Sequence, residues 1–522
     1  MQPLEIPDFS IVQSLAEHLP GIKRGIEKES LRITPQGRLS PKAHPVELGA
    51  TLTNPHITTD YSEALPEFIT KATAERTRPI EELTEIHQFT HQFLQDELLW
   101  PLSMPCSMGE EKDIPIARYG RSNSGQMKEI YRIGLGYRYG RFMQTIAGVH
   151  YNFSLPDSFW QALYQQQNSQ QANTLDFQTF VSEKYMGLIR NYLRYSWLIP
   201  LFYGASPALC ESFLKVRNID LDVLSPGTRY GRHATSLRMS DLGYQNKAQS
   251  RLNISYNSLA EYIQGLESAI STPDPYYAEI GVKKDGEYIQ LSDKILQIEN
   301  EFYSSIRPKR VTQSGERPTK ALKRRGVEYI EVRALDLNPF SPVGVTQSQI
   351  ALIDTFLVAC LFSNSPGINL RETAEYQDNF SRVVRQGRHP DLNLMLNNHC
   401  ISLQEFAGNL LNQLKPVAQL LDEVYQVNDH QSEVNRLTHQ LSDLNSTFSG
   451  RIVNQIEKRE DSFFGYAMEI SREHKKYFAQ NQLTPDKLKQ YQQEAQLSHT
   501  RKSEIEDGDT LSFEEFLASY YR

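Results

Sequence analysis

The length and charge of the chain exclude some broad classes of protein. Its 522 residues are enough for two or three domains, or for one large domain with extensions. Lysine and arginine number 55 against 63 aspartate and glutamate residues, so the net charge is −8. This balance argues against a general nucleic-acid binder, which would carry a basic surplus.

The N-terminus and the cysteines indicate a reduced, cytoplasmic protein without a membrane segment. Residues 1–10 have no basic region followed by an apolar run, and prolines and a glycine interrupt the longest apolar stretch, near 197–210. The cysteines are Cys106, Cys210, Cys360 and Cys400. They lie far apart and form no CxxC pair, which argues against a zinc site and a disulfide framework.

The segment 23–33 carries the first unusual chemistry. Its alternation predicts a strand that places Glu27 and Glu29 on one face and Lys28 on the other. Two neighbouring carboxylates on a buried face raise each other's pKa unless a cation lies between them, in which case both become ligands. The alternative is a solvated face whose charge is balanced by basic neighbours.

Similar polar faces recur in three later segments, 56–70, 143–155 and 326–336, each of which is predicted to be a strand. The residues that share a face are Asp60 with Glu67, Gln144 with His150 and Asn152, and Glu331 with Arg333.

Other segments follow the periodicity of helices or the composition of loops. Helices are predicted over 9–19, from 79 to before Pro101, and over 126–139, 176–197 and 256–270. Loops are expected over 101–125 and 204–244, a β-like segment over 287–303, and a mobile basic loop over 307–325. After about residue 345 the predicted segments are all helical: 346–364, 403–426, 430–445, 451–477, 484–496 and 511–520. We therefore expect an α+β protein with a catalytic core over 1–345 and a helical C-terminal part over 346–522 packed on it.

Several antiparallel strands curled into an open barrel would point five carboxylates and one imidazole into one concavity. Oxygen ligands in that number favour Mg²⁺ or Mn²⁺ over zinc. Because Mg²⁺ usually shares carboxylates with substrate phosphates, this set predicts ATP as co-substrate. The basic run that includes Lys309 and Arg310 is expected to close over the phosphates, unless it is a solvated surface segment. There is no GxxxxGK[ST] motif, and 134–140 does not fit the dinucleotide fingerprint, so ATP would bind on a sheet through metals.

These segments also resemble a known family. The stretches 25–32, 57–60, 100–106, 148–156, 235–238, 240–244 and 330–333 with 338–340 are similar to glutamate-cysteine ligase of the proteobacterial type. The match runs in order from about residue 20 to 345 and weakens beyond, where 447–452 is the clearest remaining similarity.

The resemblance implies a fold and a reaction. The fold would be like the catalytic domain of glutamine synthetase, with an antiparallel, barrel-like sheet surrounded by helices. ATP would phosphorylate the γ-carboxylate of L-glutamate, and L-cysteine would attack the acyl phosphate to give γ-glutamylcysteine in the first step of glutathione synthesis. The family also implies product inhibition by glutathione and a monomer.

The resemblance further implies roles for individual residues. The metal ligands would be Glu27, Glu29, Asp60, Glu67, His150 and Glu331. The cysteine pocket would be formed by Tyr131, Leu135, Gln144, Tyr244 and Tyr303. Asn152 and Arg238 would seat the amino-acid substrates, and Arg333 would stabilise charge on the transferring phosphoryl group. From the residues alone, Tyr131 and Leu135 are most simply core residues, four apart on a helix, and His150 is a satisfied core histidine.

Three alternatives remain at this point. A related ligase could join glutamate to another small amine, because only the second-substrate pocket would differ. A non-catalytic binding module would show gaps in the carboxylate set, and a metal-dependent hydrolase would act without ATP.

Overall fold

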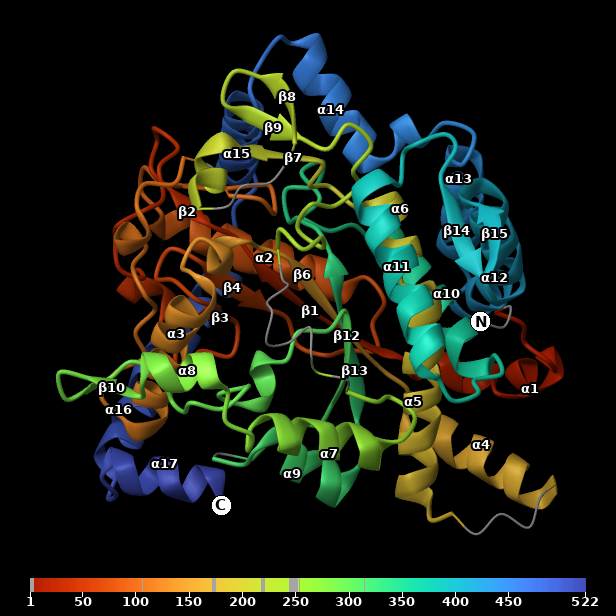
Figure 1. Ribbon diagram of the computed structural model, residues 1–522, viewed down its shortest axis with the longest axis horizontal. Helices are drawn as coiled ribbons and strands as arrows, with labels where there is room; N and C mark the ends of the chain where they lie inside the picture. The colour runs from red at the N-terminus through yellow and green to blue at the C-terminus, as the bar shows by residue number, and fades with distance from the viewer. Residues whose placement is uncertain are drawn as a thin grey trace.

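A computed structural model of the chain describes residues 4–105, 107–170, 175–216, 221–243, 252, 254–313 and 315–522. Tyr244, expected in the cysteine pocket, and Cys106 lie outside the described residues. The ribbon has a twisted sheet at its centre and helices around it (Figure 1). This arrangement confirms the mixed helix and sheet class that the sequence predicts.

The central sheet has six strands in the order β12-β13-β6-β1-β4-β3, and all neighbouring pairs are antiparallel. Their bounds are β1 Lys23–Glu29, β3 Ile57–Thr59, β4 Pro66–Ile69, β6 Val149–Ser154, β12 Ile306–Lys309 and β13 Tyr329–Leu335. Within the described part of the chain the edge strands β3 and β12 do not pair with each other, so the sheet is open there.

The two faces of the sheet differ because side chains alternate along each strand. One face of β1 carries Arg24, Ile26 and Lys28, which are buried against helices. Nε of Arg24 donates to the Asp354 carboxylate of α10 (Gln347–Phe362) at 2.6 Å. Nζ of Lys28 lies 2.8 Å from Nε2 of His87 on α2 (Arg78–Phe93). The other face carries Glu27 and Glu29, the two acids of the candidate site.

The remaining helices of the first 345 residues surround this sheet. They are α1 Phe9–Ser14, α3 Asn123–Tyr139, α4 Asp157–Gln170, α5 Phe177–Tyr195, α6 Leu198–Tyr203, α7 Leu259–Ala269, α8 Pro275–Ile280 and α9 Pro318–Arg325. Three predicted helices, now α3, α5 and α7, are confirmed. α1 is shorter than predicted because the chain changes to a 3₁₀ helix at Ala16–Gly21, which contains Pro20.

Four segments differ from their sequence prediction. The stretch 287–303 is not a strand beyond Glu287–Tyr288, because its polar groups bond to distant elements, as when the Gln290 side chain donates to backbone carbonyls of residues 277 and 281. The basic segment 307–325 contains β12 and α9, which starts at Pro318, a favoured first helical residue. Gln144 lies in a 3₁₀ turn that precedes β6. The region 204–235 holds the small sheet of β7 Ala208–Cys210, β8 Asp222–Ser225 and β9 Thr228–Tyr230.

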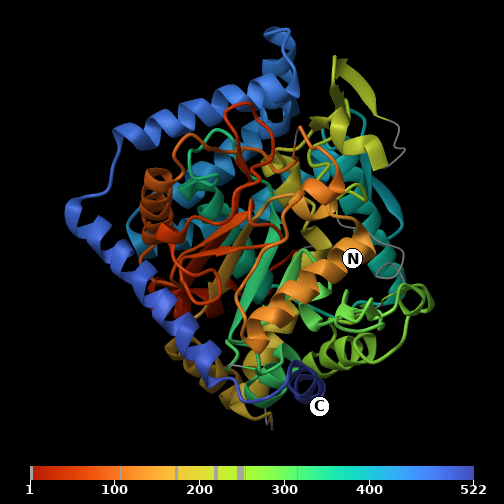
Figure 2. The same cartoon turned by 90° about the vertical axis from the view of Figure 1, so that its left-hand side faces the viewer.

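The part after residue 346 is mainly helical, as predicted. Besides α10 it contains α11 Leu370–Gln386, α12 Leu403–Tyr425, α13 Asp429–Gln440, α14 Phe448–Lys458, α15 Phe463–Gln480, α16 Pro485–Gly508 and α17 Phe513–Tyr521. The sequence did not predict α11 or the hairpin β14 Asn393–Leu396 with β15 His399–Ser402. α15 and α16 run along the outside of the molecule, and α17 ends beside α3 (Figure 2). None of the helices in the described residues is both long and apolar enough to cross a membrane.

Candidate active site

The register of four neighbouring strands assembles a row of polar residues on one face of the sheet. Glu29 of β1 lies opposite Glu67 of β4, and Glu27 lies opposite His150 of β6. Glu331 of β13 lies opposite Asn152 of β6. Directly opposed residues point to the same face, so strands far apart in sequence place their acids side by side.

His150 lies at the centre of this row. Its Nδ1 is 3.3 Å from Oε2 of Glu27 and 3.8 Å from Oε1 of Glu331, and its Nε2 is 3.8 Å from Oε1 of Glu29. The ligand atoms of Glu27, His150 and Glu331 form one compact group, and those of Glu29, Glu67 and His150 form a second. The structure thus brings together five of the six residues expected to hold metals. Asp60, the sixth, lines the same cavity outside these two groups.

The crowded carboxylates shift each other's protonation. Burial, together with the charge of Asp60, raises the pKa of Glu29 to about 8. Burial and the charges of Glu27 and Asp60 raise the pKa of Glu67 well above its usual value. Burial acts in the same direction on Glu331, but Lys309 and Arg333 outweigh it and hold its pKa well below the usual value. Two members of the cluster therefore favour the protonated form when no cation is bound.

Three basic side chains border the acids. Nη1 of Arg333 lies 3.2 Å from Oε2 of Glu331, and Nζ of Lys309 lies 3.5 Å from Oε1 of the same residue. Arg238 is almost fully buried, with Nη1 3.5 Å from the Asp336 carboxylate. Gly148, which precedes β6, is required beside it, because any Cβ at that position would overlap Nη2 of Arg238.

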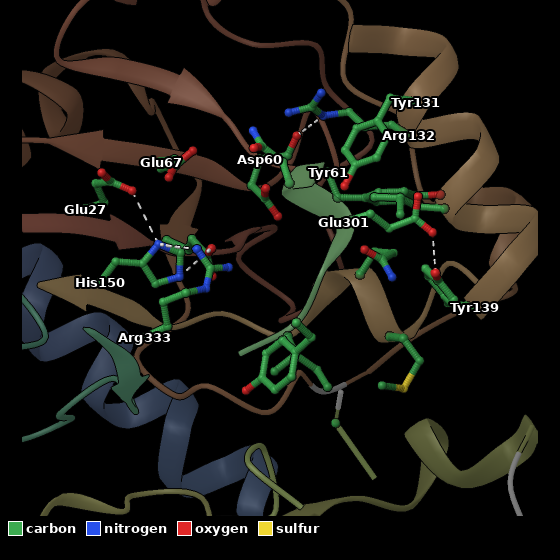
Figure 3. Close-up of a pocket in the computed structure, with 18 of the residues that line it drawn as sticks. Glu27, Asp60, Tyr61, Glu67, Tyr131, Arg132, Tyr139, His150, Glu301 and Arg333 are labelled. Atoms are coloured by element: carbon green, nitrogen blue, oxygen red, sulfur yellow. Dashed lines mark hydrogen bonds and ion pairs between the residues drawn. The ribbon is translucent and has the colours of Figure 1, made fainter. Parts of the chain in front are cut away.

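An aromatic wall faces the acids across a cavity of about 580 Å³ (Figure 3). The N-cap residue of α3 is Ser122, whose side chain accepts a hydrogen bond from the backbone N–H of Gly125. Its residues Tyr131 and Leu135, one helical turn apart, both line the cavity. Gln144 and Tyr303 line it too, so the structure places every predicted cysteine-pocket residue that it describes in this cavity.

Three other predicted site residues lie outside the cavity wall. The Asn152 side chain donates to Oε1 of Glu27 at 2.8 Å, and Arg238 lies behind Gly148. Arg310 points elsewhere, since its Nε lies 3.3 Å from Oε2 of Glu328 and its Nη1 donates to the carbonyl of residue 325. The structure therefore does not bring Arg310 to the acids, whereas Lys309 does line the cavity.

Several lining residues were missed by sequence reasoning. They are Tyr61, Arg132, Arg138, Tyr139, Met143, Ile146, Gly243, Asn300 and Glu301. Arg307, which belongs to the basic run expected to close over the phosphates, also lines the cavity. Glu301 accepts a hydrogen bond from Tyr139 (Figure 3) and another from Nη1 of Arg138 at 3.0 Å. A signal existed for the two donors, because Arg138 and Tyr139 follow Tyr131 by seven and eight positions on the same helix face. Glu301 lies in an irregular segment that carries no such periodicity.

The donor set fits a hard divalent cation such as Mg²⁺. It consists of four carboxylates and one imidazole, with no thiolate. Burial, together with the neighbouring carboxylates, raises the pKa values of Glu29 and Glu67, and a bound cation would act in the opposite direction.

Comparisons with known proteins agree with this site. The family model for glutamate-cysteine ligase matches residues 10–383. The glutamate–cysteine ligase of Alcanivorax borkumensis is 48% identical over 511 residues, which cover 97% of this chain and 97% of the relative. The glutamate–cysteine ligase of Shewanella oneidensis is 46% identical over 519 residues, 99% of this chain and 98% of the relative.

A solved structure is similar over almost the whole chain. The crystal structure of the glutamate–cysteine ligase of Francisella tularensis in complex with AMP has a TM-score of 0.90 and 35% identity, and the match covers 96% of this chain and 97% of that one. The chain therefore belongs to the glutamate-cysteine ligase family, whose activity is the first step of glutathione synthesis.

Proposed function

We propose that the protein uses ATP to convert the γ-carboxylate of L-glutamate into an acyl phosphate, which the amine of L-cysteine attacks. A carboxylate oxygen first attacks the γ-phosphorus and ADP leaves. The amine then attacks the carbonyl carbon, phosphate leaves, and one proton of the amine is released. Activation is needed because oxide is a poor leaving group from a carboxylate. The observation that carries the proposal is one cavity with a carboxylate cluster on one side and an aromatic wall on the other.

Glu27, Glu29, Glu67, His150 and Glu331 are the proposed ligands of Mg²⁺, or of Mn²⁺, with Asp60 as a further ligand. When bound, the cation neutralises charge on the phosphates of ATP. Asn152 holds Glu27 in place through its 2.8 Å hydrogen bond.

Arg333 is proposed to stabilise charge on the transferring phosphoryl group, and Lys309 to contact the phosphates, because both basic groups border Glu331 at the cavity wall. Arg238 is proposed to bind a substrate carboxylate by charge-assisted hydrogen bonds. Oδ1 of Asn152 is buried and accepts no hydrogen bond within the described residues, which suits an acceptor for a substrate ammonium.

The aromatic wall is proposed to receive cysteine and to keep water from the acyl phosphate. Tyr131, Leu135 and Tyr303 supply apolar surface there, and Gln144 supplies a polar group. Tyr244, outside the described residues, is proposed for the same pocket. Exclusion of water matters because the acyl phosphate would otherwise hydrolyse.

The test is release of ADP from the purified protein with ATP, Mg²⁺ and glutamate, with and without cysteine. We expect cysteine-dependent release, with γ-glutamylcysteine identified by its mass. Turnover with 2-aminobutyrate or a small diamine, and none with cysteine, would replace this proposal by a related ligase for another amine. Phosphate release without any amine would favour a hydrolase.

Four further points stay proposals. The protein is proposed to be a cytoplasmic monomer, to be inhibited by glutathione, and to divide into a catalytic core over 1–345 and a supporting part over 346–522. Light scattering tests the monomer, and glutathione inhibition that is competitive with glutamate tests occupation of the substrate sites.

A further inference from the structure

The segment 509–522, which we term the C-terminal clamp, lies against the outside of the aromatic wall. α16 runs along the surface and delivers the clamp, including α17, to the side of α3 (Figure 2). Arg121, just before α3, forms ion pairs of 3.3 Å with Glu506 and 2.8 Å with Asp507. These ion pairs join the end of α16, directly before the clamp, to the segment that leads into α3.

The clamp and the wall share a small apolar core of their own. Its buried members are Met127 of α3, Leu291 and Leu517 of the clamp. Around them pack Ile130, Tyr131, Tyr288, Ile298, Phe513, Phe516, Tyr520 and Tyr521. Tyr131 thus belongs both to this core and to the cavity wall. Because side chains in a core interlock at high density, the packing of α17 restricts where Tyr131 lies.

Polar contacts fix the first turn of α3 to the clamp. The Asp509 carboxylate accepts a hydrogen bond from the backbone N–H of Asn123, and the carbonyl of Leu511 accepts one from the Asn123 side chain at 2.9 Å. The first N–H groups of a helix have no partner within the helix, and a carboxylate there interacts favourably with the helix dipole. The clamp therefore stabilises the end of α3 from which Tyr131 and Leu135 follow.

The far end of the clamp reaches the opposite edge of the wall through Gln297. The hydroxyl of Tyr521 donates to the backbone carbonyl of Gln297 at 2.7 Å. The Gln297 side chain donates to the carbonyl of Tyr131 at 3.2 Å, and its backbone N–H donates to Oε2 of Glu301 at 2.6 Å. Gly134 permits this approach, because any Cβ there would overlap the Gln297 amide. One residue thus connects the clamp to α3 and to Glu301.

We propose that the C-terminal clamp is a positioning element that sets the affinity of the aromatic wall for the second substrate without touching that substrate. No residue of the clamp lines the cavity in the part of the chain that the structure describes. The contacts of the clamp reach α3 and the segment 283–301, and the carboxylate cluster lies on the other side of the cavity. The inference rests on the proposed function only in naming cysteine as that substrate.

The experiment compares Tyr521→Phe and Leu517→Ala in the full-length enzyme, with Glu514→Gln as matched control. Glu514 lies on the same helix, and its side chain is 60% exposed in an ion pair with Lys283, so its replacement should change little. Tyr521→Phe removes one neutral hydrogen bond and should raise the KM for cysteine about fivefold. Leu517→Ala should raise it about tenfold. The turnover number and the KM values for ATP and glutamate should stay within twofold of wild type.

Two further readouts separate positioning from general damage. In Leu517→Ala, backbone hydrogen exchange should be faster than in wild type over 123–139 and 297–303 and unchanged in β1. Leu517→Met, in contrast, should have a KM for cysteine close to that of wild type. An unchanged KM for cysteine in Tyr521→Phe, or an equal rise in KM for all three substrates, would overturn the inference. If Leu517→Ala does not fold, the kinetics of Tyr521→Phe alone test the inference. If the wild type acts on another amine and not on cysteine, the proposed function fails, and the clamp is judged by the KM for that amine.

Discussion

The two faces of strands β1 and β6 bury charged groups in opposite ways. On the helix-covered face, Arg24 is fully buried and its Nε donates to Asp354 at 2.6 Å, while the hydroxyl of Tyr151 donates to the other oxygen of Asp354 at 2.6 Å. The Arg24 guanidinium also donates to the hydroxyl of Tyr425 at 2.8 Å. Arg24 and Asp354 therefore have fixed partners, and this network joins the sheet to α10 and α12.

On the other face the acids gather around His150 and are only partly balanced by basic groups. Burial raises the pKa of Glu29 to about 8. A structure arranged for stability alone would not place a carboxylate where its charged form is disfavoured. A buried pair that is complete holds a structure together, whereas a buried cluster of one charge leaves room for a ligand of the opposite charge. The difference separates a structural network from the proposed metal site on the same two strands.

The largest expected effect is on turnover. Glu29→Gln should lower ATP-dependent turnover about a thousandfold, because in the proposed function Glu29 is a charged metal ligand beside the reacting phosphates. The unfolding free energy of the metal-free protein at pH 7 should stay within about 1 kcal/mol of wild type, because an amide resembles the protonated carboxyl that burial favours. ADP release measures the turnover, and urea unfolding measures the unfolding free energy. A strong loss of stability with turnover preserved would make Glu29 structural.

Asp354→Ala should have the reverse profile. Breaking a fully buried ion pair leaves Arg24 uncompensated, so the unfolding free energy should fall by about 3–5 kcal/mol. Turnover of the molecules that remain folded should stay within severalfold of wild type. Tyr425→Phe, which removes one hydroxyl from the same network, is the matched control and should cost about 1 kcal/mol. A small change in stability with turnover abolished would contradict the comparison.

Arg238 tests a basic group that borders the site and is itself paired with Asp336. Arg238→Ala should raise the KM for an amino-acid substrate about tenfold, the effect of losing a hydrogen bond to a charged group. The KM for ATP should change less than twofold. Steady-state kinetics with each substrate varied in turn gives the answer, and a selective defect for ATP would reassign Arg238 to the phosphates.

The smallest effect concerns acid sensitivity on the helix-covered face. Burial, with the positive charge of Lys28 nearby, lowers the pKa of His474 to about 4 from its usual 6.5. The unfolded chain then binds more protons than the folded chain between these values, so stability falls as the pH drops from about 6.5 to about 4. His474→Gln should flatten this slope by up to about 1.4 kcal/mol per pH unit. Urea unfolding at pH 7, 6 and 5 measures it, and an unchanged slope would exclude His474 as a source.

Much of the site was predictable because it lies on strands with strict alternation. The face shared by Glu27 and Glu29 follows from period two, and the structure adds only which strands lie beside it. That pairing depends on the register of β1 with β4 and β6, which join residues about 40 and 120 positions apart, and no local pattern encodes it. Family resemblance, and not periodicity, selected Tyr303.

The sequence predictions fail where long-range side-chain contacts, and not a local sequence pattern, determine the backbone conformation. Glu301 lies in a short 3₁₀ turn, held by Arg138 and Tyr139, so its place in the cavity depends on residues far away in sequence. The basic stretch 307–325 was mistaken for a loop because its charges obscured the apolar pair Ala321 and Leu322, which α9 buries. Charge density alone is a poor guide to loops when a proline and a few apolar residues start a helix.

The strand order has a consequence for folding. β6 lies between β1 and β13, and β13 is about 180 residues later in the chain. Until β13 and β12 are in place, β6 presents a row of unpaired backbone N–H and C=O groups as an exposed edge, and such edges promote aggregation. Contacts of such long range also form slowly. A fragment that stops before residue 329 should therefore aggregate, and the intact chain should refold best at low protein concentration.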